Sequence, residues 1–207
     1  DRRRFRLAAQ NAYYKDEGGY TGEVSFAMLR GLVHYGIIGH SERRIYFDET
    51  DKIVRDKVAA AVRNGITPVI CIGETAAEKA NSQTKRVIHG QLCTALSDLT
   101  SNEVEEVVVA YEPVWAISNL GGKIAYPDDV EKIMVYIRLQ VEDLFGKKTA
   151  ERIRLLYGGS VDNHNVSGFL AMEGCDGVLV GSASLNAHKF SAIIDEAYKL
   201  NRRKQNG

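Results

Sequence analysis

The sequence contains few of the residues that mark secreted, metal-binding or membrane-spanning proteins. Its three cysteines, Cys71, Cys93 and Cys175, are widely spaced, so they indicate neither a disulfide framework nor a Cys-x-x-Cys zinc pair. The five histidines are scattered along the chain. No apolar run approaches the roughly 20 residues that a helix needs to cross a bilayer. We therefore expect a cytoplasmic protein with no metal ion, no cofactor and no membrane partner.

An excess of charge of one sign is also absent. The 207 residues include 27 basic and 27 acidic side chains, so the formal net charge is +0 and no long-range field would attract nucleic acid. Small basic clusters at residues 2–6 and 202–204 are more often solvated than used for targeting or nucleic-acid binding. A chain of this length is expected to form one domain and to bury roughly 70% of its unfolded surface.

Segments typical of strands alternate with segments typical of helices along the whole chain. The expected strands lie at residues 7–11, 35–39, 68–72, 107–110, 153–157 and 177–180. Apolar residues at helical spacing predict helices between them, and the last helix is expected to bury Phe190, Ile193, Ile194 and Ala197. This alternation predicts βαβ units and a parallel sheet, closed as a barrel or open. Because no strand leads into Gly-x-Gly-x-x-Gly and no P-loop is present, an open nucleotide-binding sheet is the weaker choice.

The most informative segment is Tyr-Glu-Pro-Val-Trp at residues 111–115. It follows an apolar run at residues 107–110 that is typical of a buried parallel strand. Glu112 therefore stands at the carboxyl end of a strand, where barrel enzymes keep their chemistry. Pro113 ends the strand because it cannot donate to a sheet ladder. A loop of mostly small residues follows at 116–123, which together with Glu112 predicts a carboxylate base at the root of a mobile lid.

Several blocks of the sequence resemble the triosephosphate isomerase family, and they stand in family order. These blocks are residues 8–11, 20–25, 39–44, 71–74, 110–117, 157–161 and 177–185. The resemblance implies a (β/α)8 TIM barrel, of which residues 1–207 would form a single partial domain. It also implies an intramolecular aldose–ketose isomerase of glycolysis and gluconeogenesis.

The sequence departs from the family pattern in two places. The family begins with two further βα units and carries an Asn-x-Lys whose lysine contacts the substrate. Nothing like either precedes Asp1, so the six expected strands resemble the third to eighth strands of the barrel, with open edges at both ends. The lid is also two residues longer between Ile117 and Lys123. Ser118 takes the place of the first tip glycine, although Gly121 could supply the same backbone contact in another alignment.

The reaction that the resemblance implies interconverts dihydroxyacetone phosphate and glyceraldehyde 3-phosphate by proton transfer through an enediolate. Glu112 would be the catalytic base. His40 would polarise the substrate carbonyl as a neutral imidazole, because a helix N-terminus disfavours the imidazolium, as is known for triosephosphate isomerases. Glu42 and Arg43 would form a buried pair that orients its neighbours, unless they are a surface ion pair.

The substrate phosphate would rest on backbone amides of glycine-rich turns. The resemblance assigns phosphate binding to Ser118, Ser160, Gly181 and Ser182, since short loops let the backbone approach an anion closely. Tyr157 would hydrogen-bond to the closed lid, and Trp115 would anchor the lid hinge.

The resemblance also implies a partner, because residues 11–25 match the loop that family members insert into a second subunit. A homodimer is therefore expected, unless this loop simply faces solvent. Open barrel edges leave three interpretations of the chain: part of a longer enzyme, a fragment completed by another chain, or a non-catalytic interaction protein derived from the family. The presence of both His40 and Glu112 favours an enzyme, because a purely structural role needs neither.

Overall fold

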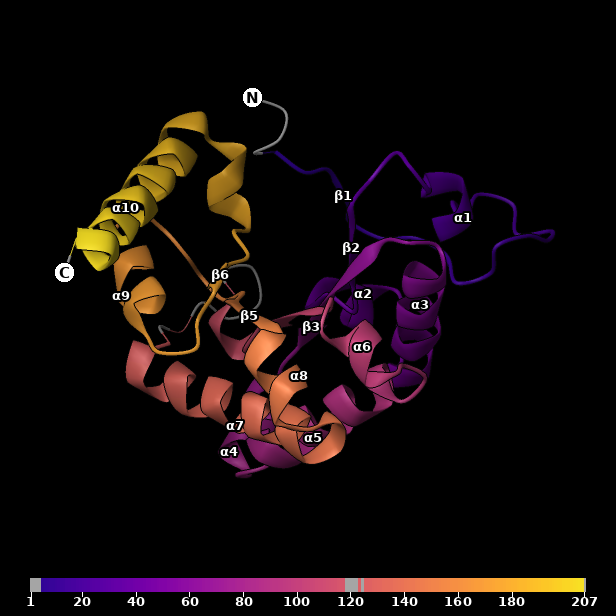
Figure 1. Ribbon diagram of the computed structural model, residues 1–207, viewed down its shortest axis with the longest axis horizontal. Coiled ribbons are helices and arrows are strands. Elements are labelled where there is room, and N and C mark those ends of the chain that lie inside the picture. Colours follow the sequence, from indigo (N-terminus) through magenta and orange to yellow (C-terminus); the bar gives the residue numbers. More distant parts are fainter. Residues whose placement is uncertain (1–4, 118–122, 124, 207) are drawn as a thin grey trace.

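The computed structural model describes residues 5–117, 123 and 125–206, and it places six parallel strands in one sheet in sequence order (Figure 1). The strands are β1 (Ala8–Ala9), β2 (Tyr35–Ile38), β3 (Thr67–Ile72), β4 (Val108–Tyr111), β5 (Arg154–Tyr157) and β6 (Gly177–Val178). The expected parallel α/β architecture is therefore confirmed. Parallel strands bring their carboxyl ends to the same edge of a sheet, and residues from those ends can meet there.

Helices connect the strands. They are α1 (Phe26–Leu29), α2 (Ser41–Tyr46), α3 (Asp51–Arg63), α4 (Ala76–Ala80), α5 (Thr84–Leu96), α6 (Ser101–Val104), α7 (Pro127–Phe145), α8 (Lys147–Arg152), α9 (Val166–Ala171) and α10 (Ala187–Asn206), with 3₁₀ turns η2 (Val114–Ala116) and η3 (Ser182–Leu185). Local signals fix their ends. The Thr50 hydroxyl accepts a hydrogen bond from the amide of Ile53 at 3.3 Å and begins α3. After α3, Gly65 adopts a φ of 69°, which glycine tolerates at a helix end.

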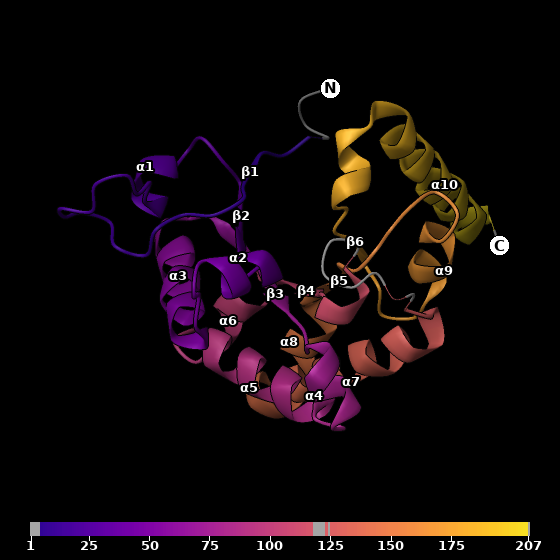
Figure 2. The same ribbon diagram turned by 180° about the vertical axis from the view of Figure 1, so that it is seen from behind.

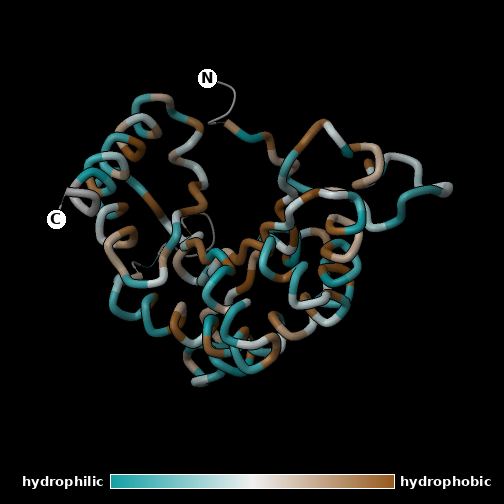
Figure 3. Tube along the Cα trace, in the orientation of Figure 1, coloured by the Kyte–Doolittle hydropathy of each residue, from teal (hydrophilic) through white to brown (hydrophobic). Residues whose placement is uncertain are grey.

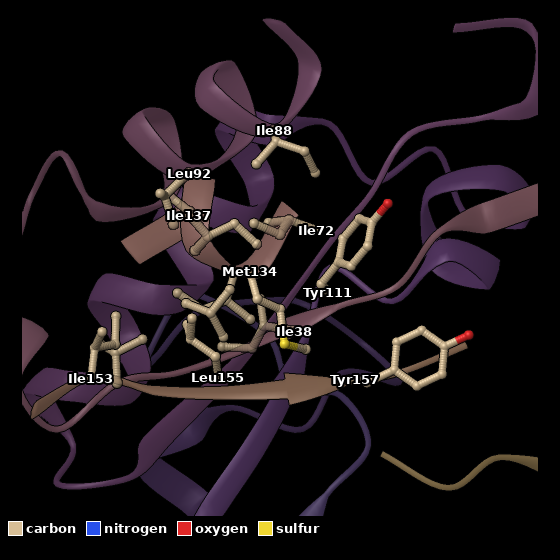
Figure 4. Close-up of a cluster of buried hydrophobic side chains, with 14 of the residues drawn as sticks. Ile38, Ile72, Ile88, Leu92, Tyr111, Met134, Ile137, Ile153, Leu155 and Tyr157 are labelled. Carbon is tan, nitrogen blue, oxygen red and sulfur yellow. The ribbon is translucent and has the colours of Figure 1, made fainter. Parts of the chain in front are cut away.

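The core lies on both faces of the central strands. On the helix-covered face, side chains of the strands pack against α5 and α7 (Figure 4). This cluster includes Ile70, Ile72, Ile88, Leu92, Met134, Ile137 and Leu155. The opposite face of β3 and β4 buries the smaller side chains of Val69, Cys71, Val108 and Ala110. Burial on both faces explains the nearly unbroken apolar runs of these strands (Figure 3).

The outer strands differ from the central ones. Among the described residues, β1 pairs only with β2 and β6 only with β5, and each spans two residues. The elements beyond them, α1 on one side and α10 on the other, lie on opposite arms of the molecule (Figures 1 and 2). Leu7 next to β1 is 67% exposed and Leu185 after β6 is 89% exposed. The sheet is thus an open half-barrel in the part of the chain that the structure describes.

The expected apolar face of the last helix is corrected by the structure. Ile193 is buried, whereas Phe190 and Ile194 are exposed and Ala197 is half-buried. The reason is that α10 packs mainly against α9 and η3, so only part of its apolar face is covered. In the described residues, no helix has the length and apolar character that crossing a membrane requires.

Candidate active site

A cavity of about 720 Å³ opens at the carboxyl ends of the strands. Residues that follow β2, β4, β5 and β6 line it together. Among them are His40, Glu112, Gly158, Ser160, Gly181 and Ser182. The residues expected at the catalytic centre therefore share one cavity with those expected phosphate residues that the structure describes, although they lie as much as 142 residues apart in sequence (positions 40 and 182).

His40 and Glu112 are in direct contact. The His40 Nε2 atom lies 2.9 Å from Oε1 of Glu112, and the second carboxylate oxygen accepts a hydrogen bond from the Ser41 amide at 3.0 Å. Glu112 is 3% exposed, so these two donors rather than water supply the hydrogen bonds of its carboxyl group. The two side chains are within reach of one small substrate at this position.

The local structure around His40 determines which nitrogen of its neutral imidazole ring carries the proton. His40 is the N-cap of α2, where Nδ1 accepts a hydrogen bond from the Glu42 amide at 3.3 Å. An accepting Nδ1 leaves the proton on Nε2, which then donates to Glu112.

The expectation that the α2 N-terminus disfavours the imidazolium stays a prediction, and the contact with Glu112 acts in the opposite direction. The hydrogen bond to Glu112 raises the pKa of His40 above its ordinary value; burial opposes this rise, and the charges of Glu112 and Glu42 add to it. The α2 N-terminus therefore does not set the ionisation of His40 alone. A ligand oxygen that separated His40 from Glu112 would weaken the contact that raises this pKa.

The backbone of Glu112 is packed against Gly73, which directly follows the neighbouring strand β3. The Glu112 amide donates to Ile72 O at 2.8 Å, and a Cβ placed on Gly73 would lie 2.0 Å from the carbonyl oxygen of Glu112. Such a contact is impossible without movement of the backbone. Glycine at position 73 therefore lets β4 place the carboxylate of Glu112 in the cavity.

A buried carboxylate holds the root of the lid. Glu74 is 1% exposed and accepts hydrogen bonds from Trp115 Nε1 at 2.9 Å and from the Tyr111 hydroxyl at 3.1 Å. Burial raises the pKa of Tyr111, so its hydroxyl remains a donor. The prediction that Trp115 anchors the hinge thus gains a partner in Glu74, for which the sequence predicts no role. Its place two residues after β3, close to the carboxyl end of that strand, was a signal in the sequence.

The two candidate anion loops differ in their present contacts. The Ser160 amide donates to the carbonyl of Ala116 at the lid root, at 3.2 Å, so binding of an anion there requires this bond to be exchanged. Gly181 caps η3, which begins at Ser182, and both residues are exposed. Ser118, the fourth residue assigned to phosphate binding, lies outside the described residues.

The structure corrects the predicted pairing of Glu42 with Arg43. The Glu42 side chain is 44% exposed and faces His40 Nδ1 at 4.0 Å. Arg43 instead forms an ion pair with buried Glu49, which also binds Lys57. Burial tends to raise the pKa of Glu49, but the hydrogen bonds from Lys57 and Arg43 outweigh it and hold that pKa below its usual range. No local pattern predicts this cluster, because its members meet only after α2 and α3 have packed.

Tyr157 occupies a buried position beneath the cavity. It is 1% exposed, and its ring stacks on Phe169 with 3.9 Å between the centroids. A Cβ on Gly159 would lie 2.1 Å from the Tyr157 hydroxyl, so the glycine turn folds directly over this group. The predicted bond from Tyr157 to the lid falls on residues outside the described part of the chain.

Comparisons with known proteins agree with this geometry. The family model described as triosephosphate isomerase matches residues 2–197. A triosephosphate isomerase of Chloroherpeton thalassium is 46% identical over 198 residues, which cover 95% of this chain and 78% of that protein. The enzyme of the same name from Carboxydothermus hydrogenoformans is 44% identical over 189 residues, with 91% and 74% coverage. One from Clostridium botulinum is 44% identical over 191 residues, with 92% and 76% coverage.

Proposed function

The chain belongs to the triosephosphate isomerase family, and on this premise we propose that it interconverts dihydroxyacetone phosphate and glyceraldehyde 3-phosphate. The observation that carries the proposal is the contact of 2.9 Å between His40 and Glu112 in a cavity that glycine-rich loops complete. The chain is thus an aldose–ketose isomerase. A non-catalytic interaction protein is not favoured, because such a protein has no need of an aligned acid–base pair.

In the proposed reaction, Glu112 removes a proton from the substrate carbon next to the carbonyl. His40 donates its Nε2 proton in a hydrogen bond to the carbonyl oxygen, which becomes the oxygen of an enediolate. The proton of the neighbouring hydroxyl group moves by way of His40 Nε2 to the former carbonyl oxygen, and Glu112 returns its proton to the former carbonyl carbon, so the neighbouring oxygen becomes the new carbonyl. His40 Nε2 lies 2.9 Å from the carboxylate of Glu112 itself, so the substrate oxygen would take the place of the carboxylate as the acceptor.

The phosphate would bind the amides of Gly181 and Ser182 on one side and that of Ser160 on the other. Ser118 would add a contact from the lid. Backbone amides bind a dianion without the cost of ordering long side chains. Because the Ser160 amide now donates to the lid root, phosphate binding would release this bond and favour lid movement.

We also propose how the chain relates to the barrel of its family. Its six βα units would correspond to the third to eighth units in one domain spanning residues 1–207. The 74% to 78% coverage of the relatives supports this correspondence. Residues 11–25 would dock on a second copy in a cytoplasmic homodimer. The rings of Tyr13 and Tyr20 on this loop lie 4.7 Å apart, and Val24 is 50% exposed, which fits a surface that a partner covers.

A coupled isomerase assay with the Glu112→Asp variant tests the proposed function. The shorter side chain withdraws the carboxylate by about one methylene, and a displacement of this order is expected to lower kcat roughly 10²-fold. Glu106→Asp, at an exposed position, is the matched control and should retain full activity. Equal rates for Glu112→Asp and wild type would remove Glu112 as the base, and a folded but inactive wild type would reject the function.

A further inference from the structure

We propose that Arg44 is a positioning residue that fixes the peptide leading into His40 and thereby aligns the imidazole with Glu112. The inference rests on the proposed isomerase function. Arg44 is the fourth residue of α2 and does not line the cavity among the described residues. Its action on the reaction would therefore pass through His40 rather than through the substrate.

The guanidinium of Arg44 connects three elements behind the catalytic pair. Nε donates to the carbonyl of Gly39 at 2.8 Å, and Nη2 donates to the carbonyl of Cys71 on β3 at 3.4 Å. Nη1 donates to the Asp51 carboxylate in the first turn of α3 at 2.6 Å. The planar fork of arginine allows these donations in three directions from one group.

The contact with Gly39 is what links Arg44 to catalysis. The carbonyl of Gly39 belongs to the same peptide unit as the amide of His40, so a donor on that oxygen fixes the plane from which His40 extends. The main chain of Arg44 adds a second contact, because its amide donates to His40 O at 3.1 Å. Side chain and main chain of Arg44 thus hold the residue before His40 and His40 itself.

The packing at Gly39 leaves no freedom for another arrangement. Gly39 has a φ of 74°, and a Cβ there would lie 3.1 Å from Arg44 Nη2 and 3.0 Å from a methyl group of Val54. The guanidinium therefore lies directly against the glycine backbone. The Arg44 side chain is 17% exposed, so water would replace its donors poorly if it were removed.

The charge of Arg44 does not by itself explain a catalytic effect. Asp51 neutralises the guanidinium, and Arg44 is not among the groups that shift the pKa of His40. A role through hydrogen-bond geometry therefore predicts that a lysine at this position, which keeps the charge but lacks the fork, only partly replaces arginine.

The test compares Arg44→Met and Arg44→Lys with Arg55→Met. Arg55 forms ion pairs with Asp56 and Asp98 on the outer side of α3, so its removal controls for loss of an arginine–aspartate pair. We expect Arg44→Met to lower kcat roughly 10²-fold with KM within about threefold of wild type. Arg44→Lys should fall between Arg44→Met and wild type, and Arg55→Met should leave both constants unchanged.

A second readout separates positioning from loss of fold. In protein labelled with ¹⁵N-histidine, the Nε2 resonance of His40 should move in Arg44→Met relative to wild type, at a temperature where circular dichroism shows both fully folded. An unchanged resonance, or a kcat within twofold of Arg55→Met, would overturn the proposal. If Arg44→Met does not fold, Arg44→Lys decides by the same measurements. An inactive wild type would reject the proposed function, whereas the His40 resonance would still decide the role of Arg44.

Discussion

The centre of the sheet and its edge carry the residues for two different parts of the proposed reaction. His40 and Glu112 follow β2 and β4, and the neighbouring strand β3 is buried along almost its whole length. Gly181 and Ser182 instead follow β6, an edge strand of two residues with one partner in the described sheet. Dense packing therefore positions the proposed proton-transfer pair, whereas the proposed phosphate loop lies on a short, exposed stretch of backbone.

This difference has a physical consequence for how each part responds to change. Around Glu112, backbone atoms are packed closely against one another, as at Gly73. A substitution that shifts the backbone there should therefore lower both stability and catalytic activity. Around Ser182, a Cβ built on Gly181 would meet nothing within 4 Å. Changes there should alter binding of the phosphate and leave the rest of the chain folded. Three substitutions test this contrast.

Gly73→Ala is expected to have the largest effect. Its Cβ would lie 2.0 Å from Glu112 O and 2.6 Å from Glu112 C, so β3 and β4 must separate. Overpacking of this kind should lower the free energy of unfolding by about 3 kcal/mol or more, measured by urea denaturation, and should abolish most activity. Gly181→Ala is the matched control, and similar losses in the two variants would remove the distinction between centre and edge.

Ser182→Pro should affect substrate binding while preserving the fold. Proline removes one amide donor at the first position of η3, where its fixed φ is tolerated. A lost hydrogen bond to a charged group should raise KM about tenfold or more, with kcat and the free energy of unfolding nearly unchanged. Steady-state kinetics beside Ser182→Ala, which keeps the amide, provides the measurement. A KM equal to that of Ser182→Ala would show that this amide does not hold the phosphate.

The pH dependence contributed by His40 should be the smallest effect. Because the pKa of His40 is raised in the folded protein, chiefly by the hydrogen bond to Glu112, its protonated form adds stability that is fully present below the unfolded pKa of about 6.5. That contribution is lost as the pH rises through the folded pKa. The difference in unfolding free energy between wild type and His40→Gln should therefore shrink from acidic to alkaline pH. A difference that grows with pH would contradict the direction of this shift.

Much of the centre could be predicted from the sequence. Apolar runs gave the six strands to within a few residues, because a parallel strand that is buried on both faces leaves a clear pattern. Glu112 could be placed at a strand end because Pro113 follows it at once. The family resemblance implied that His40 shares its site, and the strand-end rule agrees with that placement.

The charged contacts could not be predicted in the same way. The family resemblance predicts that Arg43 pairs with its neighbour Glu42. In the structure Arg43 binds Glu49 instead, because the segment after α2 folds back against that helix. The sequence predicts no role for Arg44, since its acceptors are mostly backbone carbonyls that carry no sequence signal. The prediction that the whole apolar face of α10 is buried is also wrong, because hydrophobic spacing shows which residues could pack but not whether another element covers them.

The central claim, proton transfer by Glu112, is tested most directly by running the isomerisation in D₂O. The proton that a carboxylate takes from the substrate becomes exchangeable with solvent, so deuterium enters the product whenever exchange precedes return. The account predicts that glyceraldehyde 3-phosphate formed by the wild type carries deuterium at C2, as read by NMR, and that Glu112→Gln forms almost no product. A Glu112→Gln variant that forms product at the wild-type rate would contradict the account.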